Sequence, residues 1–148
     1  MTGNVMLPVT LMAAGGLALI NFWLGVRIGQ VRGKAKISVG DGGHEPLIRR
    51  MRAQANFIEY APLVLALIGL IEFNIGSTVW LWVVASAFLV SRVLHGFGMD
   101  GWAAGRGIGT GVTMLVMVGL GLYAIALPLL AGRTHADERP SVVTVPTG

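Results

Sequence analysis

Four long apolar segments constrain this chain of 148 residues more than any other feature. They lie at approximately Val5–Val26, Leu47–Phe73, Ser77–Leu94 and Ile108–Ala131. Each can cross a hydrocarbon core of roughly 30 Å as a helix that rises about 1.5 Å per residue. No segment alternates as a strand does, and four strands are too few to close a barrel in lipid. We therefore expect an all-α integral membrane protein, a bundle of four transmembrane helices in a lipid bilayer.

The composition agrees with a membrane location. Only 12% of the residues are charged and the mean hydropathy is +0.72, whereas a soluble domain of this length needs more polar surface. The chain has no cysteine, which excludes disulfides and a cysteine nucleophile. No histidine, aspartate or glutamate cluster has metal-ligand spacing, so we expect no metal. The net charge is +4, but no basic run is interleaved with aromatic residues, so we expect no nucleic-acid partner.

The chain divides into a transmembrane domain, residues 1–132, and a polar tail, residues 133–148, which we expect to be disordered. Between the last two apolar segments, a glycine-rich connection is expected at about His95–Gly107. Ser77 is the expected N-cap of the third helix. Two pairs of glycines spaced by four, Gly105/Gly109 and Gly107/Gly111, would let the fourth helix approach a neighbour closely.

The basic residues predict the orientation in the membrane. Seven of the 11 lysines and arginines lie between Arg27 and Arg52, and Arg92 and Arg106 flank the third connection. Cytoplasmic loops carry the excess of positive charge. We therefore expect the first and third connections to face the cytoplasm and both termini to be non-cytoplasmic.

A polar stripe runs along the first half of the second segment. Its members are spaced i, i+4, i+7 and i+8: Arg52, Asn56, Glu59 and Tyr60. This spacing places them on one helix face over two turns. Ionisable groups at membrane depth usually face a bundle interior, a partner or a wet cavity. The stripe is therefore the strongest functional signal in the chain.

The stripe has two readings. Glu59 could pair with an arginine of a neighbouring helix and act only in packing. Alternatively, the stripe lines a pocket, open to the cytoplasm, for an anionic or zwitterionic ligand. There Arg52 would bind a carboxylate, Asn56 would bond amides and Glu59 would pair with an amino group. Pro62 leaves the Ile58 carbonyl without its helical donor, and a kink there would widen this half of the bundle.

The stretch from Arg52 to Pro62, RAQANFIEYAP, resembles the motif of the MAPEG family, the membrane-associated proteins in eicosanoid and glutathione metabolism. The shared pattern is R-x-x-x-N-x-x-E-Y-x-P. The expected four-helix layout, the orientation and the chain length also agree with that family, and the likeness covers roughly residues 5–131. The run Gly40–Gly43 is similar to bacterial members, which implies a bacterial inner membrane.

The resemblance implies a homotrimer that binds glutathione, its co-substrate, between subunits on the cytoplasmic side. The implied binding residues are Arg52, Asn56, Glu59, Tyr60, Gln54, Arg92 and His95. Gln54 is expected to point to another helix face. In the family's transferases an arginine at the start of the fourth helix stabilises the thiolate, and Arg106 matches its position. A fixed cation does favour a thiolate, although Arg106 could also be only a positive-inside anchor.

The implied activity is that of a membrane-bound glutathione transferase, which conjugates glutathione thiolate to lipophilic electrophiles in detoxification. The chain departs from eicosanoid-converting members, because His95 and Met99 stand where those have tyrosines. A non-catalytic glutathione- or lipid-binding scaffold of the same family is therefore the alternative. His95 itself either bonds the ligand or is a solvated histidine at a loop edge. A transporter is disfavoured, because the polar stripe stops about halfway across.

Overall fold

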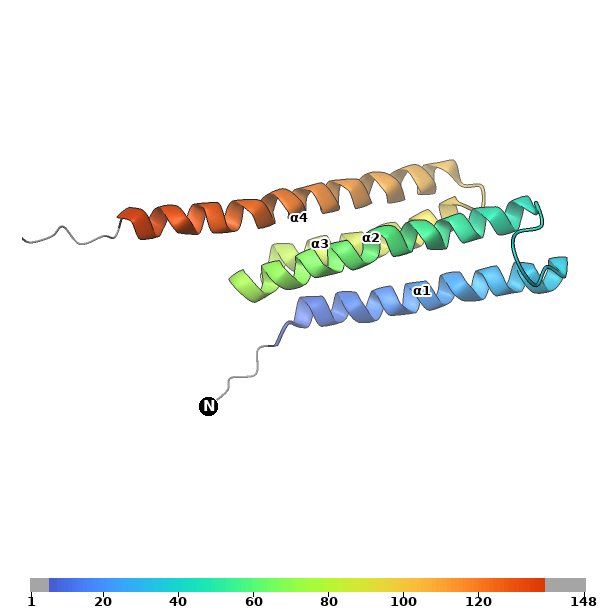
Figure 1. The fold of residues 1–148 in the computed structure, drawn as a ribbon, viewed down its shortest axis with the longest axis horizontal. Coiled ribbons are helices and arrows are strands. Elements are labelled where there is room, and N and C mark those ends of the chain that lie inside the picture. Colours follow the sequence, from blue (N-terminus) through green and yellow to red (C-terminus); the bar gives the residue numbers. More distant parts are fainter. Residues whose placement is uncertain (1–5, 138–148) are drawn as a thin grey trace, which may run out of the picture.

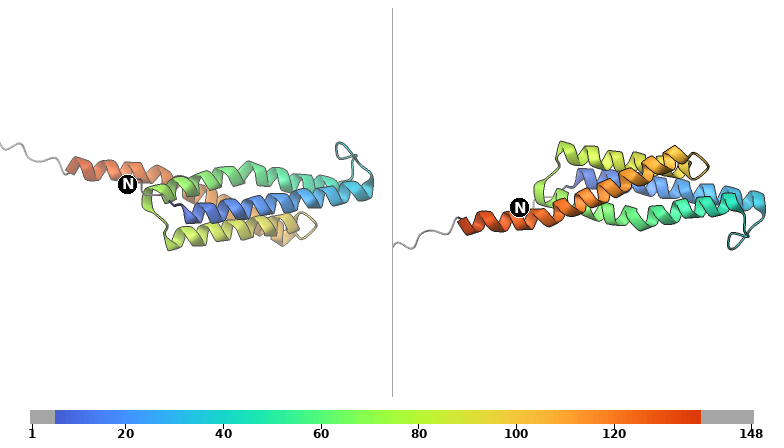
Figure 2. Two further views of the ribbon diagram at one scale, coloured as in Figure 1. Left: turned by 90° about the horizontal axis from the view of Figure 1, so that it is seen from below. Right: turned by 90° about the horizontal axis from the view of Figure 1, so that it is seen from above.

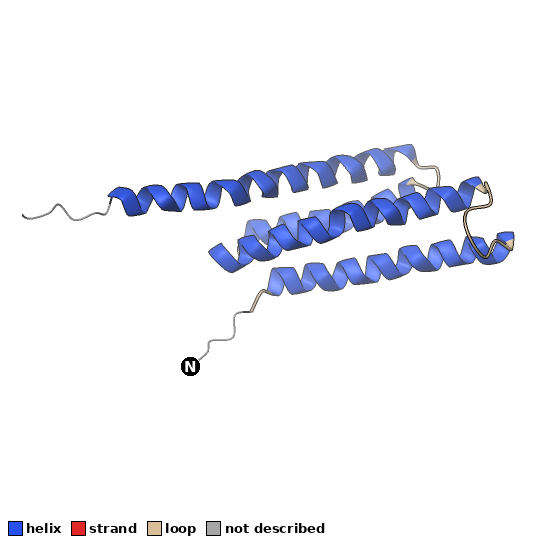
Figure 3. Ribbon diagram, viewed as in Figure 1, coloured by secondary structure: helices blue, strands red, loops and turns tan. Residues whose placement is uncertain are grey.

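The computed structural model describes residues 6–137, and side chains are described up to residue 130. The chain forms four helices: α1 (Pro8–Ala35), α2 (Glu45–Ile75), α3 (Val79–Gly98) and α4 (Ala103–Asp137). All four are long and apolar enough to cross a membrane. Within residues 6–137 there is no strand (Figure 3). The expected four-helix, all-α integral membrane protein is confirmed.

The helices form an up-and-down bundle in which α1 packs on α2 and α3, and α4 packs on α3 and α2. The α1–α2 and α3–α4 connections lie together at one end, here called the connection end (Figure 1). The start of α1 and the α2–α3 turn lie at the other end. Figure 2 shows α4 crossing the bundle obliquely and projecting beyond it. Because α4 runs to Asp137, it includes the first residues of the expected tail; residues 138–148 lie outside the described part.

The core is a continuous line of apolar side chains contributed mainly by α1, α2 and α3. Its fully buried members include Val9, Val64, Ile68, Leu81 and Phe88. Up to residue 130, α4 adds only Leu120 to this buried apolar set. Many large apolar side chains lie on the outside instead, as expected where lipid is the solvent. The helices therefore associate through close packing and polar contacts rather than by hiding apolar surface from water.

One such polar contact joins α2 to the start of α1, at the end of the bundle opposite the connection end. Glu72, 1% exposed near the end of α2, accepts hydrogen bonds from the backbone N–H of Val9 (2.9 Å) and of Thr10 (2.8 Å). The Thr10 hydroxyl also donates to it at 2.6 Å. These are N-terminal amides of α1, which have no partner within their own helix. A carboxylate is well placed there because the helix dipole is positive at this end.

The expectation that Ser77 caps α3 is wrong. The residue before α3 is Thr78, and it makes no side-chain capping hydrogen bond. The Ser77 hydroxyl donates instead to Glu72 Oε1 at 2.6 Å. The Ser77 hydroxyl could either accept from a backbone amide of α3 or donate to the buried carboxylate. The bond to the carboxylate is charge-assisted and therefore the stronger of the two.

The third connection is much shorter than the glycine content suggested. Helix α3 extends to Gly98 and α4 begins at Ala103, so only four residues join them. The backbones of α3 and α4 are in contact at Gly98, where no side chain fits. A Cβ on Gly98 would lie 2.1 Å from the Arg106 backbone nitrogen. His95 is consequently a helical residue, only 6% exposed. The reading of His95 as a solvated loop-edge histidine is wrong.

The four glycines of the two predicted pairs have different surroundings. A Cβ on Gly109 would lie 2.7 Å from His95 Cβ and 2.7 Å from the Ser91 carbonyl oxygen, so Gly109 lets α4 approach α3. Gly105 faces the ring of Trp102. Gly107 and Gly111 meet nothing within 4 Å in the described chain. The close approach therefore occurs inside one chain, at Gly109.

Candidate functional site

The polar stripe lies on the side of α2 that faces α3 near the connection end. A hollow of about 510 Å³ opens there, and α2 lines it with Arg52, Ala55, Asn56 and Glu59. Its α3 side is formed by His95 and, just beyond the helix, Met99. Arg52 and Glu59 are exposed, and Asn56 is half-buried. The 3.6-residue period thus brings three members of the predicted stripe to one cavity wall.

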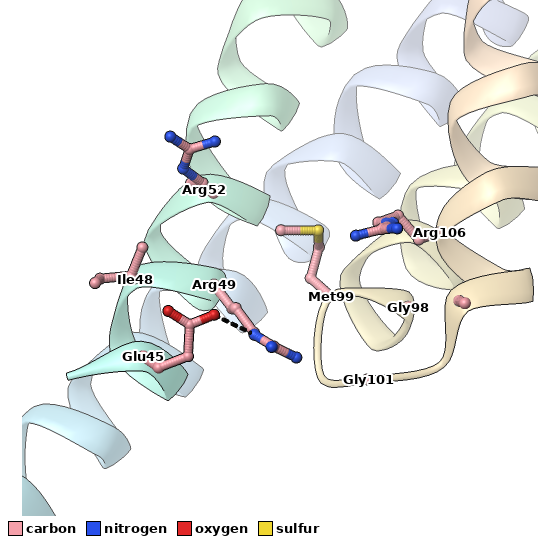
Figure 4. Close-up of a pocket in the computed structure, with 9 residues that line it drawn as sticks. Glu45, Ile48, Arg49, Arg52, Gly98, Met99, Gly101 and Arg106 are labelled. Carbon is pink, nitrogen blue, oxygen red and sulfur yellow. Dashed lines mark hydrogen bonds and ion pairs between the residues drawn. The ribbon is translucent and has the colours of Figure 1, made fainter. Parts of the chain in front are cut away.

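A second hollow of about 540 Å³ continues the first toward the connection end. Arg52 and Met99 line both, and the second adds Arg106 from the first turn of α4. We call the two together the polar groove. Figure 4 shows Arg106 pointing toward Met99, with Arg52 on the opposite, α2 side. The groove therefore combines three of the four residues of the predicted stripe with the predicted thiolate-stabilising arginine.

The charges of the polar groove are mostly unpaired. At its mouth Arg49 Nε donates to Glu45 Oε1 at 2.8 Å (Figure 4, dashed line). In the part of the chain with described side chains, no ion pair involves Arg52, Glu59 or Arg106. Glu59 therefore pairs with none of the arginines up to residue 130. These three charged groups remain available to a ligand or to a second subunit.

Arg92 does not line the groove but supports its wall. It is 2% exposed, and its Nη1 donates to Asn56 Oδ1 at 3.0 Å while Nη2 donates to the Gly109 carbonyl at 3.0 Å. The guanidinium thereby joins α2, α3 and α4. Because the Asn56 oxygen is engaged, its amide N–H₂ is the group left to donate into the groove.

His95 has a partner of its own behind the groove. Its Nδ1 lies 3.3 Å from the Thr110 hydroxyl of α4. The ring also lines the first hollow, next to Asn56 and Glu59. The Thr110 hydroxyl can donate to this nitrogen or accept from it, so the contact is compatible with either ring tautomer.

Besides Arg92, two further residues of the predicted set do not line the groove. Gln54 Nε2 donates to Asn21 Oδ1 at 3.3 Å, on the α1 side of α2. Tyr60 is half-buried and lines neither hollow. Conversely, sequence reasoning missed Glu45, Ile48 and Arg49 as groove residues. Their helical spacing relative to Arg52 was the available signal, since i−3, i−4 and i−7 share a face.

No group of three or more histidine, aspartate or glutamate side chains that could hold a metal occurs among the residues that the structure describes. The chemistry of the groove therefore comes from arginine, glutamate, asparagine and histidine. Such a set can bind a ligand that carries both carboxylates and an amine, and it can stabilise an anion.

The fold and the groove define the class: an integral membrane protein of four spanning helices with a polar groove at one end of the bundle. Comparison with protein families gives a match to the MAPEG family model over residues 10–126, which includes Arg52, Glu59, His95 and Arg106. The chain belongs to the MAPEG family. That family includes glutathione transferases and non-catalytic members. Comparison with curated proteins gives no significant match.

Proposed function

We propose that this protein is a membrane-bound glutathione transferase, which conjugates the glutathione thiolate to lipophilic electrophiles. The observation that carries the proposal is that Arg52 and Arg106, from α2 and α4, line one hollow. Asn56 and Glu59 continue the same wall deeper in the bundle. Glutathione is the co-substrate, in keeping with the family.

The dimensions of the stripe fit a tripeptide. From Arg52 to Glu59 the helix advances roughly 10 Å at about 1.5 Å per residue, and an extended tripeptide spans at most roughly 10–11 Å. Arg52 binds a carboxylate, the Asn56 amide bonds the peptide groups, and Glu59 pairs with the amino group. Their order along α2 matches a ligand with its charges at the two ends.

The chemistry depends on a cation near the thiol. A thiol with a pKa of about 8.5 is mostly protonated at neutral pH, and only the thiolate is nucleophilic. Arg106 supplies the positive charge, and the thiol proton passes to water at the open mouth of the groove. The thiolate attacks the electrophilic carbon, a carbon–sulfur bond forms, and the leaving group departs with its electron pair. A lipophilic substrate concentrates in the bilayer and reaches the groove from there.

A homotrimer accounts for the exposed charges. Glu59 and Arg52 are exposed on a helix of a membrane protein, and an uncovered charge facing lipid is costly. A second copy that packs against this face covers the groove and turns it into a site between subunits. The residual polar groups are then shared by two chains. The membrane is the bacterial inner membrane, with the groove at its cytoplasmic side.

One observation favours a second candidate, a non-catalytic glutathione- or lipid-binding scaffold. Met99 lines both hollows of the groove, and a thioether is at most a weak acceptor. It therefore offers no hydroxyl to a reacting sulfur. In that case the groove binds without activating its ligand.

Purified protein in detergent, titrated with glutathione by calorimetry and by ultraviolet absorbance, separates the candidates. The transferase binds glutathione, shows thiolate absorbance near neutral pH and conjugates 1-chloro-2,4-dinitrobenzene. Binding without thiolate or conjugation makes the protein a scaffold. Absence of both binding and conjugation excludes glutathione as the ligand.

A further inference from the structure

Asp100, on the α3–α4 connection, bridges two arginines from other helices. Its Oδ2 pairs with Arg27 Nη2 of α1, and its Oδ1 lies 3.2 Å from Arg50 Nε of α2. The Arg27 side chain is only 9% exposed and that of Asp100 36%. Neither the family motif nor the polar groove includes this cluster, which we call the Asp100 latch: Arg27, Arg50 and Asp100.

The arginines of the latch are themselves held in place. Arg27 Nη1 donates to the Gly96 carbonyl of α3 at 2.9 Å, and its guanidinium lies 4.5 Å from the centroid of the Trp23 ring. Arg50 Nη1 donates to the Arg27 carbonyl at 2.8 Å. Asp100 is therefore tied to a rigid frame of α1, α2 and α3.

The segment that Asp100 anchors forms one wall of the polar groove. Gly98, Met99, Gly101 and Ala103 flank Asp100 in sequence, and all of them line the hollow shared with Arg106. Gly98 packs directly on the backbone of Arg106. A displacement of the connection would therefore move the first turn of α4, and Arg106 with it.

We infer that Asp100 is a positioning residue, which holds Arg106 over the polar groove opposite Arg52. The inference rests on the proposed function for the role of Arg106 in thiolate formation. Asp100 directs its carboxylate to Arg27 and Arg50, so it orients Arg106 through the backbone and does not neutralise it. The positive charge of Arg106 stays available to the thiol.

Breaking the latch has a specific consequence. Removing the carboxylate leaves Arg27 nearly buried without its counter-charge, which strongly disfavours the native arrangement of a buried pair. The connection then loses its tie to α1 and α2, whereas Arg52, Asn56 and Glu59 on α2 are untouched. Ligand binding is retained while activation of the thiol is lost.

The kinetic test compares Asp100→Asn with Asp100→Glu and with Asp41→Asn. Asp41 is a matched control, because it is an exposed acid in the α1–α2 connection outside the groove. We expect Asp100→Asn to lower kcat by about tenfold or more, the size of one lost transition-state contact, and to abolish thiolate absorbance with little change in glutathione affinity. Asp100→Glu should retain part of the turnover and part of the thiolate absorbance. Asp41→Asn should leave turnover and thiolate absorbance unchanged.

A second measurement reads the position of the connection without using activity. The chain has no native cysteine, so Ile48→Cys and Ala103→Cys can carry spin labels on opposite walls of the groove. Labelled protein is diluted with unlabelled protein so that each assembly holds one labelled copy. The distance distribution should be narrow with Asp100 and with Asp100→Glu, and broad or shifted with Asp100→Asn.

The two measurements distinguish failure of this inference from failure of the proposed function. If the wild type conjugates and Asp100→Asn keeps full turnover and thiolate, Asp100 does not position Arg106. If the wild type neither binds glutathione nor forms thiolate, the proposed function fails. The spin-label distances alone then decide whether Asp100 holds the α3–α4 connection in place. A distribution unchanged by Asp100→Asn then overturns the inference, and a broadened one supports it.

Discussion

Arg52, Asn56 and Glu59 form one wall of the polar groove because α2 repeats every 3.6 residues. Asn56 is additionally fixed by the buried guanidinium of Arg92. Arg52 and Glu59, in contrast, have no ion-pair partner in the part of the chain with described side chains. At the scale of single residues, the α2 wall of the groove thus consists of an asparagine held in place by Arg92, with an unpaired charged side chain on each side of it.

Removing either charge should weaken glutathione binding. We expect Arg52→Ala and Glu59→Gln each to cost about 1.5–3 kcal/mol, the range for hydrogen bonds to charged groups. Calorimetry in detergent measures the change. Lys34→Ala, an exposed cation outside the groove, is the control and should bind as the wild type. If both groove variants fold and bind normally, the stripe is structural.

Removing Arg106 should separate binding from activation. Arg106→Ala keeps the α2 wall intact, so glutathione affinity stays nearly constant. Turnover should fall at least tenfold, equivalent to about 1.4 kcal/mol of barrier, and the ultraviolet signal of bound thiolate should disappear. Equal conjugation rates in variant and wild type would leave Arg106 as a membrane-surface anchor.

At the scale of elements, the contact between α3 and α4 decides where the site residues lie. Gly98 and Gly109 let the two backbones meet, and Arg92 bridges from α3 to the Gly109 carbonyl. This contact buries His95 and brings the first turn of α4 to the groove. The glycine-rich sequence between them therefore forms packed helix ends and only a short turn.

The close approach at Gly109 is open to a direct stability test. A methyl group there would meet the α3 backbone at 2.7 Å, so Gly109→Ala should destabilise the protein by about 1–3 kcal/mol, as overpacking does. Gly111→Ala is the matched control, since nothing lies within 4 Å of its added methyl. Thermal unfolding in detergent compares the two. Equal stability of both variants would contradict the tight α3–α4 contact.

At the scale of the whole molecule, four spanning helices leave charged and apolar side chains on the outside of one chain. Lipid accommodates the apolar ones, whereas Arg52 and Glu59 need cover. The connection end also gathers most of the arginines and lysines near the polar groove. The positions of these charges are therefore the basis of both the assembly and the orientation that we predict.

Assembly into a homotrimer should be visible by native mass spectrometry in detergent. We expect three chains per particle, because packing between copies covers the charged face of α2. Glutathione should stay bound to the trimer and be lost on dissociation, since adjacent copies share the site. A clean monomer that still binds glutathione would rule out the shared site.

The orientation follows from the positive charges at the connection end. The start of α1 and the far end of α4 both lie on the side opposite the connections, with α4 projecting further (Figure 1), so both termini should be outside the cytoplasm. Alkaline phosphatase fused after Gly148 should be active in a bacterial host, and the same reporter inserted after Gly42 should be inactive. The reverse pattern would invert the topology.

The sequence by itself determined the class of fold and one wall of the groove. Apolar segments long enough to span lipid leave few alternatives to helices, and a helix places residues four and seven apart on one face. These are local rules, which need no knowledge of other helices. For the same reason Arg52, Asn56 and Glu59 could be grouped before the fold was known.

Only the tertiary structure decided what faces that wall. Arg106 meets the groove, His95 is buried, and Asp100 pairs with Arg27 because helices distant in the chain pack side by side. The hydrogen bonds of Glu72 to the first amides of α1 likewise join residues that are distant in the chain. Spacing carries no information about such pairs, since which helices touch depends on how side chains such as Gly109 allow backbones to approach.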